Sequence, residues 1–357
     1  MSFSPTQIED LDELTLAHID RKSWEDVSLP NYNYVMEDAL GGRGGKTHTK
    51  GGKTLDFKLQ YQNNGSFAVS GLYDTAQSER QDKMKNASAP WSKTRISYNY
   101  DIDEPVFQGD ELTEVIDFLE VEQHASWNDW FAGMEELMWT APTSPTQNPM
   151  PPWGIPLWIQ TTGATSTVGF NGGDPSGFTD GLCGVLTATV EGWKNCNGTF
   201  AAVDDDDFVR KVVKSMDFCN FKAPHNYKEL NKGSPDWAMY SAAYQNLEEL
   251  RSLQKSQNTD IGPDLGKYSR NPQIRGVPVV HVPEMERTGS AALRTDRAVF
   301  GVNWTKMKYV FAKGRDLQWS PLIIPNKQAS VRERFGWRWG NFRCTNRRSQ
   351  WVLTYSA

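Results

Sequence analysis

One long amphipathic stretch, from Asp110 to Trp139, constrains this chain most. Its apolar residues recur at the i, i+3, i+4, i+7 spacing of a single helix face, and carboxylates and amides occupy the rest. The face comprises Leu112, Val115, Ile116, Leu119, Trp127, Trp130, Phe131, Met134, Leu137 and Met138. A helix over 110–139 would be about 45 Å long. Because the average helix has only about a dozen residues, we expect this one to be a spine along which a domain is built.

The amino-acid composition excludes several classes of protein. Of the 357 residues, 38 % are hydrophobic and 23 % are charged, which is typical of a globular chain. The formal net charge of −6 argues against a protein that coats nucleic acid over its whole surface, although it leaves a local basic face open. The acidic N-terminus is unlike a signal peptide, and no apolar run is long enough for a membrane span. We therefore expect a soluble protein made in a cytoplasm, without membrane contact.

No pattern indicates catalysis, a metal or a cofactor. The cysteines form no CxxC pair, and the five histidines form no HExxH. GxSxG does not occur, and no cysteine has the flanking residues of a known nucleophile family, so the sequence gives no signature of these nucleophilic enzymes. The Gly-rich GGRGGKT at 41–47 lacks the first glycine and the preceding strand of a phosphate-binding loop. The sequence predicts no enzyme, no metal site and no cofactor.

Two alternating segments predict half-buried strands. In 54–62, Leu55, Phe57, Leu59 and Tyr61 share one face, and Thr94, Ile96, Tyr98, Tyr100 and Ile102 alternate in the same way further on. The polar excursion over 63–90 between them is too long for an ordinary loop of a compact domain. We expect 51–105 to form a long hairpin that projects from the body.

Residues 1–50 are predicted to be an N-terminal arm. Leu11 and Leu14 belong to a short amphipathic helix, after which LGGRGGKTHTKGGKT has too little apolar area to fold alone. We interpret this stretch as a flexible basic linker. Its cations are Arg43, Lys46, Lys50 and Lys53.

A second helix is predicted over Asp205–Cys219, with Phe208, Val212 and Met216 among its apolar residues. The run of aspartates at its start resembles a calcium loop superficially. Capping of the helix N-terminus is the commoner role for such residues. The preceding stretch, 153–203, has no helical period and is expected to be ordered but irregular.

The last third of the chain predicts mixed α/β structure followed by long strands. Strands are expected at Trp237–Ser241, Ile274–Val282, Phe300–Trp304 and Tyr309–Ala312, with a helix at Tyr244–Gln254. After Pro325, Val331, Phe335, Trp337 and Trp339 alternate with Arg332, Arg334 and Arg338. We interpret the aromatic side as the core face and the arginine side as the solvated face. A stacking platform for single-stranded nucleic acid is the alternative, and both interpretations hold if the arginines line a container of nucleic acid.

These parts, in this order, resemble the major capsid protein of tailed bacteriophages. Six short segments also resemble a subfamily of phage capsid sequences. They are PWGIPLWI at 152–159, GFNGGDPSGFT at 169–179, WKN at 193–195, DDFVRKVVKSMDFCNFKAP at 206–224, GVNWTKMKYVF at 301–311 and CTNRRSQWVLTYSA at 344–357. The resemblance implies an α+β fold with an N-terminal arm (1–50), an extended-loop hairpin (51–105), a peripheral domain (106–222), an axial domain (223–325) and C-terminal strands that return to the peripheral domain (326–357).

The resemblance also implies a function and partners. Copies of the chain would assemble as pentamers and hexamers into an icosahedral shell around double-stranded DNA, in the host cytoplasm, with portal, scaffold and decoration proteins as further partners. Contacts between copies are expected at Leu11, Leu14, Phe67, Leu72, Tyr73, Arg80, Lys83, Lys85 and Trp91, and contacts to DNA at Arg43, Lys46, Lys50 and Lys53. An arm of this length leaves no room for a large fused scaffolding domain, so we expect a separate scaffold or none.

Three alternatives stay open at this point. An encapsulin-like nanocompartment shares the fold but encloses enzymes, a tail or baseplate component would form tubes or plates, and a Trp-rich carbohydrate-binding protein belongs to another class. Some family members also join subunits through a Lys–Asn isopeptide bond. Lys83 and Lys85 lie where its donor would be, but solubility explains lysines at a loop tip equally well, and no acceptor can be named.

Overall fold

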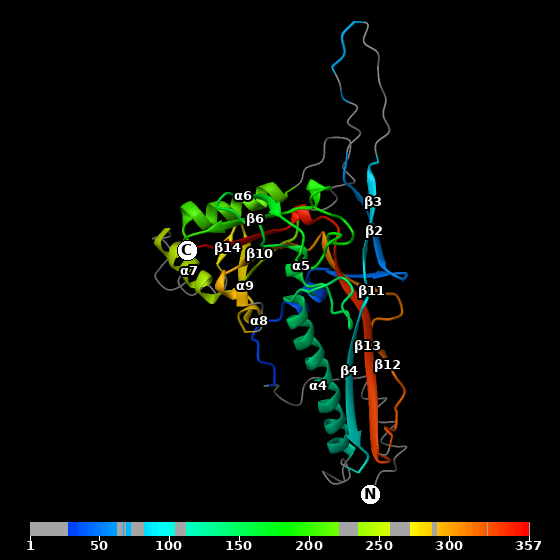
Figure 1. Ribbon diagram of the computed structural model, residues 1–357. Helices are drawn as coiled ribbons and strands as arrows, with labels where there is room; N and C mark the ends of the chain where they lie inside the picture. Colours follow the sequence, from blue (N-terminus) through cyan, green and yellow to red (C-terminus); the bar gives the residue numbers. More distant parts are fainter. Residues whose placement is uncertain are drawn as a thin grey trace.

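The computed structural model describes residues 28–62, 67, 69–72, 82–103, 112–220, 235–257, 272–287, 291–326 and 328–356. Within these ranges the strands form a seven-stranded sheet, a five-stranded sheet and a two-stranded hairpin. We call the first the large sheet and the second the long sheet. Figure 1 shows them as two parts of an elongated molecule, with the hairpin projecting from one end. The fold is mixed α+β, as predicted.

The spine helix is present as α4 (Leu112–Met138), two residues inside its predicted start. It runs beside β4 (Ser92–Asp101) and β13 (Val331–Cys344), which pair antiparallel over ten residues. Among the described side chains, Trp130, Met134 and Met138 are buried in the core as the period predicts. The predicted start of the helix at Asp110 lies outside the described residues.

The long sheet has the order β1-β11-β13-β12, and β4 also pairs with β13. Its other strands are β1 (Lys46–Thr49), β11 (Met307–Ala312) and β12 (Gln318–Trp319). Two close approaches depend on glycines of β13. A Cβ at Gly340 would overlap the ring of Tyr309, and a Cβ at Gly336 would lie 2.9 Å from the Trp319 ring.

The prediction of a flexible linker was wrong for the glycine-rich segment. Lys46–Thr49 pairs parallel with β11, and Gly45 O accepts from Tyr309 N at 2.7 Å. The preceding α2 (Val35–Glu37) and the π-helix η1 (Asp38–Gly42) bury Val35, Met36 and Ala39 in the core. Pairing of backbone groups with the edge of β11 needs no apolar side chains, which is why the composition did not indicate it.

The expected faces of β13 are reversed. Arg334 and Arg338 are 4 % and 8 % exposed, whereas Phe335, Trp337 and Trp339 are half-buried. Arg338 faces α4, because its guanidinium carbon lies 4.0 Å from the centre of the Trp130 ring. The alternation correctly predicted a two-faced strand. It could not say which face the helix covers.

The large sheet has the order β5-β6-β14-β10-β7-β9-β8. Its strands are β5 (Gly169–Gly172), β6 (Asn195–Phe200), β7 (Trp237–Ser241), β8 (Gln273–Ile274), β9 (Val277–His281), β10 (Val299–Asn303) and β14 (Trp351–Tyr355). The predicted strands at 237–241 and 300–304 are therefore present, whereas the single strand predicted over 274–282 is divided, because Ile274 belongs to β8 and pairs antiparallel with Val277 of β9. The prediction of irregular structure over 153–203 missed β5, β6, the helix α5 (Ile155–Trp158) and the 3₁₀ turn η2 (Glu191–Trp193).

Helices cover the large sheet. The predicted second helix is observed as the π-helical turn η3 (Asp205–Val209) followed by α6 (Arg210–Cys219). Asp204 Oδ1 accepts from Asp207 N at 2.6 Å, so this member of the aspartate run acts as a cap. The other helices are α7 (Tyr244–Gln257), α8 (Pro283–Arg287) and α9 (Ala291–Thr295), and the 3₁₀ turn η5 (Arg347–Ser349) leads into β14.

The sheets do not follow the predicted domain limits along the chain. The strand β11, from the stretch 223–325, belongs to the long sheet, and β14, from 326–357, belongs to the large sheet beside β6. The C-terminal strands thus connect the two parts: β13 lies against the spine helix and β14 lies inside the large sheet. Consequently neither part is built from one continuous segment.

Candidate interaction surfaces

The hairpin consists of β2 (Leu55–Gln60) and β3 (Met84–Ala89), which pair antiparallel from Leu55 with Ala89 to Gln60 with Met84. Leu55, Ala87 and Ala89 are buried at its base. The alternation in 54–62 is confirmed, because Leu55, Phe57 and Leu59 face the core and the polar residues face outward. Strand β3 was not predicted, because its residues, MKNASA, have little apolar alternation.

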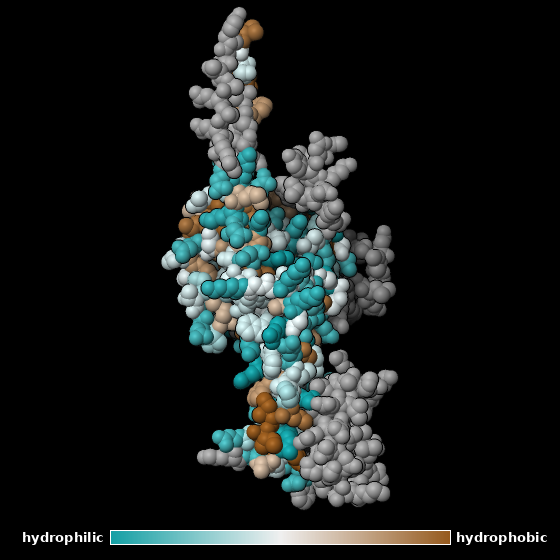
Figure 2. All heavy atoms as spheres, turned by 90° about the vertical axis from the view of Figure 1, so that its right-hand side faces the viewer, coloured by the Kyte–Doolittle hydropathy of each residue, from teal (hydrophilic) through white to brown (hydrophobic). Residues whose placement is uncertain are grey.

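The described residues near the tip of the hairpin carry exposed apolar side chains. Phe67, Val69 and Leu72 are 93 %, 90 % and 94 % exposed. They stand clear of the body, and Figure 2 shows apolar colours on this projection. A folded chain gains nothing from exposing such side chains to water, so these three residues are candidates for a contact surface. Phe67 and Leu72 were predicted as contacts, and Val69 was not.

The other predicted contact residues lie in three settings. Lys83 and Lys85 are half-buried along the hairpin, on either side of the exposed Met84. Trp91 is not on the projection, because it packs against the core and its Nε1 donates to Gly52 O at 2.9 Å. The remaining four, Leu11, Leu14, Tyr73 and Arg80, lie outside the described residues.

A second exposed apolar pair lies beside the long sheet. Ile323 and Ile324 are 42 % and 57 % exposed, shortly after β12. Ile323 exchanges both backbone hydrogen bonds with Glu333 of β13, each at 2.9 Å. The signal in the sequence is the segment WSPLIIP at 319–325, which places adjacent isoleucines between two prolines.

The four predicted DNA contacts do not form one free basic patch. Arg43 donates to Asp38 Oδ2 at 2.7 Å and to Asp236 Oδ1 at 3.0 Å. Lys46 pairs with Asp316. Lys50 and Lys53 are exposed in the loop between β1 and β2. Two of the four charges are therefore balanced within the chain.

The buried face of the long sheet holds a paired cation. The guanidinium carbon of Arg338 lies 4.0 Å from the Trp130 ring centre and 4.9 Å from that of Trp127, and Nε lies 3.5 Å from Asp316 Oδ1. Burial lowers the pKa of Arg338, and Asp316 counteracts that effect. This arrangement attaches the spine helix to β13. It does not present a charge to a ligand.

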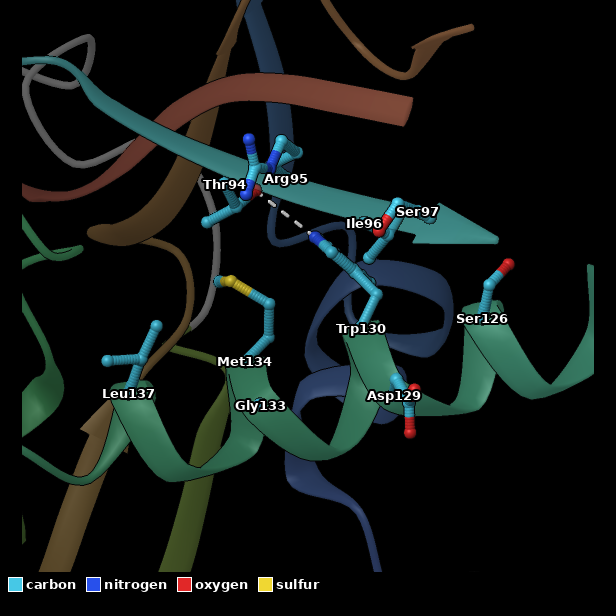
Figure 3. A pocket seen from close by; sticks show the side chains of 10 residues that line it. All are labelled: Thr94, Arg95, Ile96, Ser97, Ser126, Asp129, Trp130, Gly133, Met134 and Leu137. Atoms are coloured by element: carbon cyan, nitrogen blue, oxygen red, sulfur yellow. Dashed lines mark hydrogen bonds between the residues drawn. The ribbon is translucent and has the colours of Figure 1, made fainter. Parts of the chain in front are cut away.

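A hollow of about 310 Å³ lies between α4 and β4 (Figure 3). Trp130 spans it, and its Nε1 donates to Thr94 Oγ1 at 3.2 Å. Ser126 Oγ donates to Gln123 O of its own helix, so this hydroxyl is engaged. The lining has no histidine, cysteine or lysine that could activate a nucleophile. We assign no chemistry to this hollow.

Other reactive groups are buried. All four cysteines are free and buried, and burial raises the pKa of the Cys344 thiol to about 11. In the described ranges, no group of three His, Cys, Asp or Glu side chains is placed to hold a metal ion. None of the helices in those ranges combines the length and apolarity needed to cross a lipid bilayer.

A buried carboxylate joins the N-terminal segment to the spine helix. Glu135 of α4 is fully buried; its Oε2 accepts from Met36 N at 2.7 Å and its Oε1 accepts from Trp139 Nε1 at 2.9 Å. Burial raises its pKa to about 7, and the two hydrogen bonds lower it. Close by, Asn31 Nδ2 donates to Glu284 Oε2 at 2.7 Å. The chain before β1 is thus hydrogen-bonded to both parts of the molecule.

These features together define a class of protein by its fold. The fold that α4, the two sheets and the hairpin make up is shared by solved structures of phage capsids. Solved structures with this fold are similar to the chain over nearly its whole length. No protein-family model and no curated protein matches it in sequence.

Three of these structures illustrate the likeness. The "Cyanophage A-1(L) capsid asymmetric unit" has a TM-score of 0.60 at 13 % identity and covers 96 % of this chain and 98 % of its own. The "Capsid of native GTA particle computed with C5 symmetry" has a TM-score of 0.53 at 11 % identity, covering 96 % and 99 %. The structure of Microbacterium phage Oxtober96 has a TM-score of 0.51 at 11 % identity and covers 96 % of this chain and 98 % of its own.

Proposed function

We propose that this protein is the major capsid protein of a tailed bacteriophage, a structural protein without catalytic activity. The observation that carries the proposal is the likeness of the whole chain to the cyanophage capsid subunit, at a TM-score of 0.60 over 96 % of its length. Copies of the chain would form pentamers and hexamers of an icosahedral shell that encloses double-stranded DNA. The shell would be assembled in the host cytoplasm.

The two parts of the molecule then have distinct roles. The part around α4 and the long sheet would be the peripheral domain, and the large sheet with α6 and α7 would be the axial domain near the capsomer axis. The hairpin β2–β3 would be the extended loop, and residues 1–27 would complete the N-terminal arm. Portal, scaffold and decoration proteins would be further partners of the shell.

The hairpin supports assembly on physical grounds. Phe67, Val69 and Leu72 are almost fully exposed in the single chain, at the end of a projection with a buried base. A contact of this kind is heterologous, because the tip of one copy covers a different surface of the next. Rotational symmetry closes such contacts into rings, which are capsomers. The total buried area then grows with every copy added.

DNA contact would be weak and independent of sequence. Lys50 and Lys53 are exposed, while Arg43 and Lys46 are paired with carboxylates of their own chain. A few phosphate contacts from each copy suffice in a shell, because the copies act together. We propose no cofactor and no metal.

Expression of the full chain alone tests the proposal. Size-exclusion chromatography with light scattering would give the mass of the particles, and cryo-electron microscopy would give their form. Closed shells, or ring-shaped pentamers and hexamers, are the expected products. A monomer at every concentration, also after addition of the scaffold protein encoded beside it, would overturn the proposal.

A further inference from the structure

The outward face of the long sheet carries an aromatic row next to two cations. Phe335, Trp337 and Trp339 lie on this face of β13 and are half-buried. At two residues per step, the row is about 13 Å long. The register places Trp337 opposite Arg95 and Trp339 opposite Lys93 on β4, and both cations are exposed. We call these five residues the outer aromatic face.

The two cations rest on the rings. Lys93 Nζ lies 5.5 Å from the ring centre of Trp337 and 5.7 Å from that of Trp339, and the guanidinium carbon of Arg95 lies 5.3 Å from that of Phe335. Neither has a carboxylate partner among the described residues. Arg338 on the opposite face has both aromatic neighbours and Asp316. The outer aromatic face therefore has rings and cations, as the surroundings of Arg338 do, but it has no carboxylate that corresponds to Asp316.

The part of the chain before Ser28 has the complementary chemistry. Residues 1–27 contain seven carboxylates and two cations, so they carry −5 of the formal net charge of −6. Leu11, Leu14, Ile19 and Trp24 supply apolar side chains among these carboxylates. A chain of 27 residues reaches up to about 90 Å when extended, so distance limits neither its own sheet nor that of a neighbour.

We propose that the outer aromatic face is the docking surface for residues 1–27 of a copy of this chain. Leucines or Trp24 of the segment would cover the rings, and its carboxylates would pair with Lys93 and Arg95. A DNA backbone fits the surface less well, because two cations already held against aromatic rings offer few phosphate contacts. This inference does not depend on the proposed function.

Photo-crosslinking of the full chain tests the inference. Trp337 is replaced by benzoylphenylalanine, the protein is irradiated, and peptides joined to residue 337 are identified by mass spectrometry. Crosslinks to residues 1–27 are expected, and a mixture of isotope-labelled and unlabelled copies tells whether the segment comes from the same chain or a neighbour. Crosslinks to any other segment, or to nucleic acid alone, would overturn the inference.

Charge reversal provides the second measurement. In the double variant K93E/R95E, trypsin should cleave after Arg21 and Lys22 several-fold faster than in the unchanged protein. The control variant K50E/K53E makes the same change in charge at exposed lysines of another loop, and its cleavage rate should not change. Equal rates in both variants would overturn the inference. Shells that form normally while residue 337 crosslinks elsewhere would count against this inference alone.

Discussion

At the scale of single residues, Glu135 makes the stability of the fold depend on pH. The folded chain raises the carboxyl pKa from 4.5 to about 7, so the folded state binds this proton more tightly than the unfolded state. The stability from this group is fully present below pH 4.5 and is lost as the pH rises through 7. The shift corresponds to about 3 kcal/mol.

We predict that Glu135→Gln flattens this pH dependence. The amide stays neutral, so the free energy of unfolding from urea titrations should no longer fall between about pH 5 and 8. At low pH the variant should lose about 1 kcal/mol, because one amide oxygen cannot accept from both Met36 N and Trp139 Nε1. Glu136→Gln is the matched control at an exposed neighbour. An unchanged slope in E135Q would show that another group titrates.

Arg338 provides a second prediction at this scale. Arg338→Met keeps the volume of the side chain but removes its charge from two tryptophan rings and from Asp316. We expect a loss of about 2–3 kcal/mol in the free energy of unfolding. Arg332→Met, at a half-buried position of the same strand, should cost less than about 1 kcal/mol. Equal losses would mean that the contact with the spine helix contributes little.

At the scale of elements, the close contact between β11 and β13 depends on a missing side chain. A Cβ at Gly340 would overlap the ring of Tyr309, which is fully packed in the core. We predict that Gly340→Ala lowers the free energy of unfolding by about 1–3 kcal/mol, measured by urea titration. Gly192→Ala is the control, because a Cβ there meets no atom within 4 Å. A loss no larger than in the control would show that the ring can move aside.

The elements also show what a sequence pattern can predict. Helix α4 was predicted closely because its apolar residues have a clear period, whereas β7 is a short apolar run whose five residues are all buried. Strands β1, β3 and β6 were missed because backbone pairing with a neighbour holds them and their side chains carry little alternation. Periodicity reports burial on one side, so a strand with small or polar residues gives no such signal.

At the scale of the whole molecule, the hairpin tip should control association and leave the fold intact. We predict that the double variant F67S/L72S remains folded, with unchanged circular dichroism and urea midpoint, but fails to form rings or shells. Both side chains are more than nine-tenths exposed in the single chain, so their loss removes no internal packing. Light scattering measures the particle mass.

A matched control separates apolar contact from general disturbance of the hairpin. Asp82→Ser changes an exposed polar residue near the return of the hairpin, and it should assemble as the unchanged protein does. Normal shells from F67S/L72S would show that other surfaces hold the copies together. Ile323 and Ile324, at the edge of the long sheet, would then be the next residues to change.

The sequence by itself determined the spine helix, the projecting hairpin and the mixed α+β class, because each depends on local periodicity or on composition. Only the tertiary structure decided which face of β13 is buried, which strands share a sheet, and which cations are already paired. Arg338 is the clearest example. An alternating strand specifies two faces equally well, and the position of α4 beside one of them determined that the arginines lie inside and the tryptophans outside.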